Sequence, residues 1–193
     1  MENSLSESRA QEARNKAVIE RYFHEVLDRK KFDLMPELMA PGVVLHRPGF
    51  DVTGLDAAIQ RLRATLQDYT AFRSELSGLM AESDMVAVRI SHHTTVRPHT
   101  FRSRAGTVSV GKDQALNWTA IVQFRVQDGK IVEEWVMRDE LGMLAQMGTI
   151  TVGKLGPAGE TFPVLPETPV RRRDRVPCGW QIPCGPSALE DGG

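Results

Sequence analysis

An Asp128-Gly129 pair stands between two runs of β-forming residues, and this pair constrains the fold more than any other feature. Such a pair is a strong signal for a tight hairpin, because both residues tolerate a positive φ. The second run predicts a strand from Ile131 to about Arg138. A short helix is expected after it, over Glu140–Gln146 and ending at Gly148. The chain must therefore contain antiparallel strands that lead into a closing helix.

Asp139 occupies the junction between that strand and that helix. By the two-residue period of a strand, Asp139 shares a face with Trp135 and Met137. As an N-cap, its carboxylate would stabilise the helix by about 1 kcal/mol. At the rim of an apolar cavity, desolvation would instead raise its pKa and suit it to acid/base chemistry. The residue pattern by itself favours the cap.

Composition excludes several classes of function. The chain has 193 residues, of which 41% are apolar and 25% charged, with a net charge of -1. This balance argues against nucleic acid or an anionic membrane as a partner. Because the sequence shows no membrane-length apolar run and no signal-peptide core, we expect a cytoplasmic protein. Cys178 and Cys184 fall near the end of the chain and match no common zinc spacing.

The first part of the chain predicts helices. Residues 1–12 are polar without periodicity and are expected to be disordered. From Ala13 to Arg29 apolar residues recur at helical spacing, as in a helix that lies on a sheet. A second helix is expected from an Asp33 cap to Met39, and a third from a Thr53 capping box to about Asp68. Val43–His46 predicts a short strand between them.

The later part predicts strands joined by turns, over Phe72–Leu79, Met85–Val96 and Leu116–Val126. The Pro98–Ala115 segment is expected to be a loop with a short strand at Thr107–Val110. Helices followed by strands and tight turns argue for an α+β domain over residues 13–148. Its helices would pack on one face of a curved antiparallel sheet.

Residues 149–193 differ in composition from the rest. They hold seven of the 11 prolines, seven glycines and a basic run over residues 171–175. Such a segment cannot bury enough apolar surface for a core of its own. We expect an extended arm, with Cys178 and Cys184 reduced.

Between Lys16 and Gly148 the chain carries several short motifs whose order and spacing, taken together, are those of a known protein family. They are Tyr22-Phe23, Val43–His46, Gly54–Asp56, Asp84–Arg89, Trp118–Ala120, Asp128–Trp135, Asp139–Gly142 and Gln146–Gly148. In these motifs the chain resembles the SnoaL-like polyketide cyclase family, which has the nuclear-transport-factor-2-like fold. The Thr94–Gln114 region departs from the family pattern, so the resemblance leaves the substrate open.

The resemblance implies a cone-shaped α+β barrel, in which a strongly curved antiparallel sheet wraps around N-terminal helices. It implies an apolar pocket, dimers formed through the outer face of the sheet, and aldol-type ring closure of a polyketide without metal or cofactor. An aspartate at the position of Asp139 is the family's general acid/base. A shared fold does not by itself establish which reaction a protein catalyses.

Two residues are candidates for catalysis. Asp139 is the expected acid/base, and His46 could bond to Asp139 or to a substrate carbonyl, or be a satisfied core histidine. The candidates for substrate binding are aromatic or polar side chains near the expected pocket: Tyr22, Phe23, Arg89, Ser91, His93, Trp118, Trp135 and Met137. The aromatic ones could equally be plain core, and the polar face of Arg89, Ser91 and His93 could lie at a dimer interface or in solvent. No metal site is expected, because His92 and His93 point to opposite faces of a strand.

Two classes of function follow from these observations. One is a cofactor-independent cyclase or isomerase of secondary metabolism that acts on a hydrophobic, carbonyl-rich small molecule, as a homodimer or higher homo-oligomer. The other is a non-catalytic carrier or assembly module, which the arginine-bearing arm favours. Epoxide hydrolysis ranks below both, since it would need an Asp–Arg–Asp arrangement and the sequence supplies only Asp139 and Arg89 for it.

Overall fold

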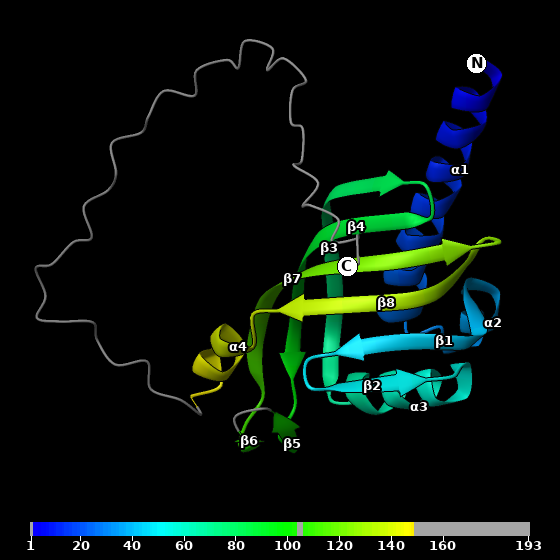
Figure 1. The fold of residues 1–193 in the computed structure, drawn as a ribbon. Coiled ribbons are helices and arrows are strands. Elements are labelled where there is room, and N and C mark those ends of the chain that lie inside the picture. Colours follow the sequence, from blue (N-terminus) through cyan, green and yellow to red (C-terminus); the bar gives the residue numbers. More distant parts are fainter. Residues whose placement is uncertain (1, 104–105, 149–193) are drawn as a thin grey trace, which may run out of the picture. The chain divides into compact units, whose positions relative to one another are not determined.

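The computed structural model describes residues 2–103 and 106–148 (Figure 1). The predicted arm over 149–193, with both cysteines, lies outside the described residues. Six helical segments are present in the described part: α1 (Glu2–Arg21), the π-helix η1 (Tyr22–Leu27), the 3-10 helix η2 (Phe32–Leu34), α2 (Met35–Leu38), α3 (Leu55–Leu66) and α4 (Glu140–Gln146). No helix among these residues is long and apolar enough to cross a membrane.

The first helix differs from its prediction at both ends. It begins at Glu2, so the expectation of disorder before Ala13 is wrong for this segment. Polar pairs at helical spacing stabilise this helix, for example Arg14 Nη2, which donates to Gln11 Oε1 at 2.8 Å on its exposed side. Asn15 is buried and donates to the Ser83 carbonyl at 3.0 Å, which ties α1 to the sheet. A search for apolar periodicity misses such a polar helix.

The six-stranded sheet has the order β2-β1-β8-β7-β4-β3. Its strands are β1 (Met39–Arg47), β2 (Phe50–Thr53), β3 (Tyr69–Glu82), β4 (Met85–Val96), β7 (Gln114–Gln127) and β8 (Lys130–Arg138). The α+β prediction is confirmed, but the sheet is mixed, because β1 runs parallel to β8. Between β1 and β8 the chain passes through β2, a helix and five further strands, so these two strands are free to pair in parallel, whereas a tight hairpin can pair its strands only in the antiparallel way. The expected cone shape stays a prediction.

Several local expectations are corrected. β1 begins at Met39, runs through Pro41-Gly42, and is longer than the predicted Val43–His46 strand. Gly54 is the N-cap of α3 without a side-chain bond, so the Thr53 capping box does not form. The expected loop before Ala115 instead contains the hairpin of β5 (His99–Ser103) and β6 (Gly106–Val110).

The predicted turn at Asp128-Gly129 is confirmed, with φ values of 50° and 74°. Next to the turn, Val126 pairs with Ile131, but Arg125 then pairs with Glu133. Val132 is therefore an extra residue on β8, which is the arrangement of a β-bulge. Beyond it, every β8 side chain faces the side opposite to the one that a simple hairpin would give.

The core lies between the helices and one face of the sheet, which we call the inner face; the opposite face is the outer face. Fully buried residues from α1 and η1, such as Ile19, Tyr22 and Phe23, pack on β7 and β4 residues such as Phe124 and Ile90. Figure 1 shows α4 at the end of β8, apart from α1 and α3. Between the helices and the inner face the packing leaves a cavity.

Candidate functional site

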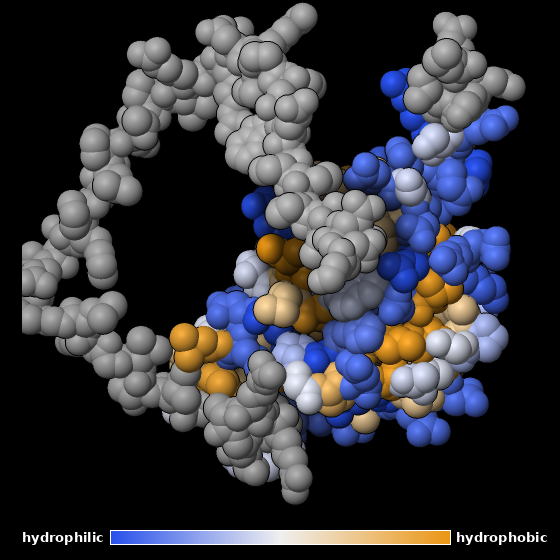
Figure 2. Space-filling view, in the orientation of Figure 1, coloured by the Kyte–Doolittle hydropathy of each residue, from blue (hydrophilic) through white to orange (hydrophobic). Residues whose placement is uncertain are grey.

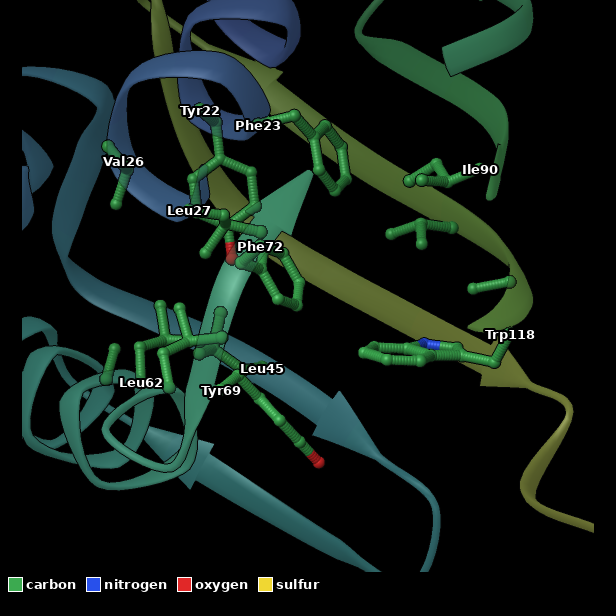
Figure 3. Close-up of a cluster of buried hydrophobic side chains, with 14 of the residues drawn as sticks. Tyr22, Phe23, Val26, Leu27, Leu45, Leu62, Tyr69, Phe72, Ile90 and Trp118 are labelled. Carbon is green, nitrogen blue, oxygen red and sulfur yellow. The ribbon is translucent and has the colours of Figure 1, made fainter. Parts of the chain in front are cut away.

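A cavity of about 120 Å³ lies between η1, α3 and the inner face of the sheet. Its walls are mostly aromatic and aliphatic, and Figure 3 shows several of these side chains converging from η1, α3 and the sheet. The lining comprises Tyr22, Phe23, Leu27, Arg47, Phe50, Arg61, Leu62, Thr65, Leu66, Tyr69, Phe72, His92, Trp118, Ala120, Val122, Glu134, Val136 and Arg138. Apolar walls with a few convergent polar groups are typical of a small-molecule site.

Aromatic rings form one wall of the cavity. Trp118 lies 5.8 Å from Tyr69 and 5.9 Å from Phe72, measured between ring centroids, and both pairs are tilted. Tilted pairs at this spacing are favourable for rings and hold them in fixed orientations. The wall can therefore receive a flat or cyclic apolar group.

A buried ion pair forms the polar part of the lining. Arg47 Nη2 donates to Glu134 Oε2 at 2.8 Å, and their side chains are only 14% and 4% exposed. The Tyr22 hydroxyl donates to the same oxygen at 3.5 Å. Burial, and then the Glu134 charge, raise the pKa of Tyr22, so its hydroxyl keeps its proton. Burial would lower the pKa of Arg47, but the Glu134 carboxylate reverses this, and the net direction is upward.

Two further arginines, Arg61 and Arg138, line the cavity. The Arg61 guanidinium lies 4.8 Å from the centre of the Phe50 ring, at cation–π distance. Burial, and then the charges of Arg138 and Arg47, lower the pKa of Arg61. The lining thus contains three arginines and one carboxylate, Glu134. Arg47 pairs with Glu134, and Arg138 Nη2 donates to Glu140 Oε1 at 2.8 Å. The site can stabilise negative charge on a ligand oxygen.

His92 is the one histidine among the lining residues. Its ring packs against Trp118 and Phe72, with centroids 5.0 and 5.1 Å apart. Burial lowers the pKa of His92 to about 4, while the Asp28 charge opposes this shift. The imidazole is therefore neutral at physiological pH and can accept or donate a hydrogen bond.

A wider depression of about 880 Å³ adjoins the cavity. The two share Phe50, Arg61, Thr65, Tyr69 and Arg138. A cavity of about 150 Å³ accommodates one benzene ring in other proteins. The inner cavity therefore suits a single ring or chain end, and the depression can hold the rest of a larger molecule.

Three of the predicted site residues, Tyr22, Phe23 and Trp118, line the cavity. The other predicted substrate contacts do not: in the ladders Arg89, Ser91 and His93 pair with β7 residues of the outer face, and so do Trp135 and Met137. Opposite residues in an antiparallel pair share a face, so these five side chains point away from the cavity.

His46 also lies away from the cavity. Its ring stacks on Trp135, with centroids 5.2 Å apart and planes 12° apart. Its Nδ1 is 3.0 Å from Asp51 Oδ1, and its Nε2 is 3.4 Å from Glu133 Oε1. Among the described residues no hydrogen bond joins His46 to Asp139, which was one of the alternatives for this side chain.

Asp139 caps α4. Its Oδ1 accepts a hydrogen bond from the Gly142 backbone N–H at 2.8 Å, and the residue is exposed. A catalytic role for Asp139 stays a prediction, and it would require the carboxylate to exchange this cap for a substrate. The preceding residue, Arg138, does line the cavity.

Sequence reasoning missed the charged lining. Glu134 and Arg138 pair with Phe124 and Ala120 of the inner face, which follows from the bulge at Val132. His92 had a visible signal, since it shares a face of β4 with Val86, Val88 and Ile90. Among the described residues, no three His, Cys, Asp or Glu side chains converge as a metal site would require.

Comparisons with known proteins agree with this architecture. The profile of the family described as SnoaL-like polyketide cyclase matches residues 17–147. No curated protein matches the chain. A structure of a candidate SnoaL-like polyketide cyclase from Jannaschia sp. CCS1 is 18% identical, with a TM-score of 0.62, over 72% of this chain and 95% of that one.

Two Streptomyces structures are also similar. AclR, a candidate hydroxylase from Streptomyces galilaeus, is 22% identical with a TM-score of 0.62 over 72% of this chain and 99% of that one. IdmH, a candidate polyketide cyclase from Streptomyces antibioticus, is 23% identical with a TM-score of 0.57 over 69% and 98%. At these identities the likeness establishes the nuclear-transport-factor-2-like fold and leaves the reaction open.

Acidification is predicted to destabilise the protein through His92. Its pKa is about 4 when folded and 6.5 as the ordinary value, so between these values the unfolded chain binds more protons. Neutral His92 makes its full contribution to the free energy of unfolding above about pH 6.5. This contribution, about 3 kcal/mol in total, is lost as the pH falls towards 4. Denaturant unfolding at several pH values should show a shallower pH dependence for His92→Gln than for the wild type. If the free energy of unfolding changed equally with pH in both proteins, the lowered pKa of His92 would be contradicted.

Proposed function

This chain belongs to the SnoaL-like polyketide cyclase family, and we propose that it is a cytoplasmic, cofactor-independent cyclase or isomerase of secondary metabolism. Its substrate would be a hydrophobic, carbonyl-rich, polyketide-like molecule in which it closes a ring. The observation that carries this proposal is the aromatic cavity with the buried Tyr22, Glu134 and Arg47 cluster and two more arginines in its lining.

The chemistry asked of such a site is limited. In an aldol-type closure, a base removes a proton from a carbon next to a carbonyl, and the resulting enolate attacks a second carbonyl. The new alkoxide then takes up a proton, so substrate and product are isomers unless water is lost afterwards. Arginine side chains and the protonated Tyr22 hydroxyl could stabilise the negative charge that develops on these oxygens.

Positioning would supply much of the acceleration. Oriented intramolecular reactions gain on the order of 7–11 kcal/mol over their free counterparts. The 120 Å³ cavity would fix one end of the substrate against the Trp118 wall, and the wider depression would hold the folded remainder. Epoxide hydrolysis of the Asp–Arg–Asp kind is less well supported, because Glu134 is the one carboxylate of the described lining.

Metabolite profiles of the producing strain test the proposal. We expect a gene deletion to accumulate a precursor that is isomeric with the final product or differs from it by water, as measured by mass spectrometry. Complementation with the wild type should remove the precursor, and complementation with Glu134→Gln should not, because the buried Arg47 charge loses its counter-ion.

A third complementation, with Asp139→Asn, tests the family acid/base at that position. Failure to rescue, with normal amounts of folded protein, would support a catalytic Asp139, whereas full rescue would leave it as a cap. A deletion strain with an unchanged metabolite profile would contradict an enzymatic role and favour a carrier or assembly module.

We also propose that the outer face forms a homodimer interface. Ile121 and Met137 pair across β7 and β8 on this face and are 59% and 73% exposed. Figure 2 shows hydrophobic residues among polar ones over the sheet face turned to the viewer. Exposed large apolar side chains next to the stacked His46 and Trp135 rings are a typical composition for an interface core.

Sedimentation measurements of the wild type and two variants test the interface. Ile121→Asp would bury a charge in the proposed contact and is expected to give a monomer, because an unpaired buried charge is strongly unfavourable. Gln60→Asp, on the exposed side of α3, adds the same charge elsewhere and should sediment as the wild type does. A monomeric wild type, or a dimeric Ile121→Asp, would contradict the proposal.

A further inference from the structure

A chain of three polar side chains reaches the cavity from η1 through β3 to β4. Ser74 Oγ lies 2.6 Å from Asp28 Oδ1 and 3.1 Å from His92 Nδ1. Ser74 and His92 are buried, with exposures of 4% and 7%, and His92 is part of the cavity lining. Asp28 directly follows η1, whereas Ser74 and His92 lie on β3 and β4, so these hydrogen bonds depend on the tertiary structure.

Proton counting fixes the direction of these hydrogen bonds. A serine hydroxyl has one proton, and a carboxylate can only accept. At 2.6 Å the Ser74 proton belongs to the bond with Asp28. The Ser74 oxygen must therefore accept from His92, and Nδ1 of the imidazole carries the proton. In a neutral ring, Nε2 then has a free lone pair.

Nε2 is the atom of His92 that remains for a ligand. Among the described residues, the imidazole has one hydrogen bond, the one to Ser74. The aromatic rings next to the imidazole are those of Phe23, Phe72 and Trp118. Apolar rings cannot satisfy an imidazole lone pair. A substrate proton in the cavity can.

We propose that His92 is the catalytic proton acceptor of this cavity and that Asp28 and Ser74 are positioning residues that hold it in the Nδ1–H tautomer. The inference rests on the proposed function and names the base for the same site. It assigns the proton transfer to a residue inside the cavity, independently of the exposed cap residue Asp139.

The proton step is balanced within the site. His92 Nε2 takes a proton from the carbon next to a substrate carbonyl, and the C–H electron pair remains on the substrate as an enolate. The imidazolium so formed is stabilised through Ser74 by the Asp28 carboxylate. After ring closure, Nε2–H returns the proton to the new alkoxide, and the ring is neutral again.

The charges around His92 favour a neutral resting state. Burial is the largest influence, His93 and Arg138 act in the same direction, and Asp28 opposes them. The free base is thus present over the whole physiological range. His24 also contacts Asp28, with its Nδ1 3.2 Å from Oδ2, from the exposed side.

A base in an apolar cavity can be tested without the natural substrate. The probe is 5-nitrobenzisoxazole: a base removes its C3 proton, the C–H pair completes a nitrile, and the N–O bond breaks to release a coloured phenolate. The full-length wild type, His92→Gln, Ser74→Ala and a matched control, Ser77→Ala, would be compared. Ser77 lies on the same strand, and its hydroxyl contacts Arg89 outside the cavity.

We expect kcat for the probe to fall on the order of 100-fold in His92→Gln, the lower range for loss of a general base. In Ser74→Ala it should fall about fivefold to tenfold with little change in KM, the factor that one neutral hydrogen bond corresponds to. Ser77→Ala should match the wild type. The wild-type rate should stay level from about pH 8 to about pH 5, since the pKa of His92 is about 4.

Ring ¹⁵N NMR of histidine-labelled protein provides the second readout. Wild-type His92 should show a protonated Nδ1 and an unprotonated Nε2, and Ser74→Ala should lose this preference while remaining folded. Equal kcat in the wild type and His92→Gln, whether high or at background, would overturn the catalytic assignment. A wild-type tautomer and kcat in Ser74→Ala would overturn the positioning role.

The two proposals can fail separately. A deletion strain with an unchanged metabolite profile, together with a His92-dependent probe reaction, would contradict the cyclase function and support His92 as the proton acceptor. A precursor that accumulates in the deletion strain, together with a His92-independent probe reaction, would keep the cyclase and assign proton transfer to another residue.

Discussion

One extra residue on β8 determines which side chains enter the interior. Because Val132 is bulged, Glu134 lies opposite Phe124 on the inner face and Trp135 lies opposite Gln123 on the outer face. Glu134 is then buried and needs a partner, which Arg47 provides from the neighbouring parallel strand at 2.8 Å. A buried carboxylate without a counter-ion would be strongly destabilising, so the bulge and the ion pair depend on each other.

The same arrangement gives the cavity two kinds of lining. The Arg47–Glu134 pair and Tyr22 form a polar cluster, whereas Trp118, Tyr69 and Phe72 form an aromatic wall beside His92. An apolar wall selects a ring or chain, and fixed charges nearby act strongly because little water screens them. The proposed enolate chemistry would use this combination, with a neutral base to take the proton and cationic groups to stabilise the oxyanion.

The fold was largely predictable from the sequence, because the Asp128-Gly129 turn and the alternation along β4 and β7 depend on local rules. The mixed sheet was not, since the parallel pairing of β1 and β8 joins segments far apart in the chain. The site was predictable only in part. Tyr22, Phe23 and Trp118 follow from apolar periodicity, but the two-residue period predicted Trp135 and Met137 on the cavity side, whereas the bulge turns them to the outer face. His92 could have been recognised as a polar residue on an otherwise largely apolar face of β4.

The central claim is that the inner cavity, and not the outer face, receives an aromatic carbonyl compound. The indole N–H signals of Trp118 and Trp135 report on the two faces, and NMR titration with anthraquinone-2-carboxylate tests them in one experiment. The account predicts that the Trp118 signal shifts in a saturable manner and that the Trp135 signal does not. A shift of Trp135 with an unchanged Trp118 would place the ligand on the outer face and contradict it.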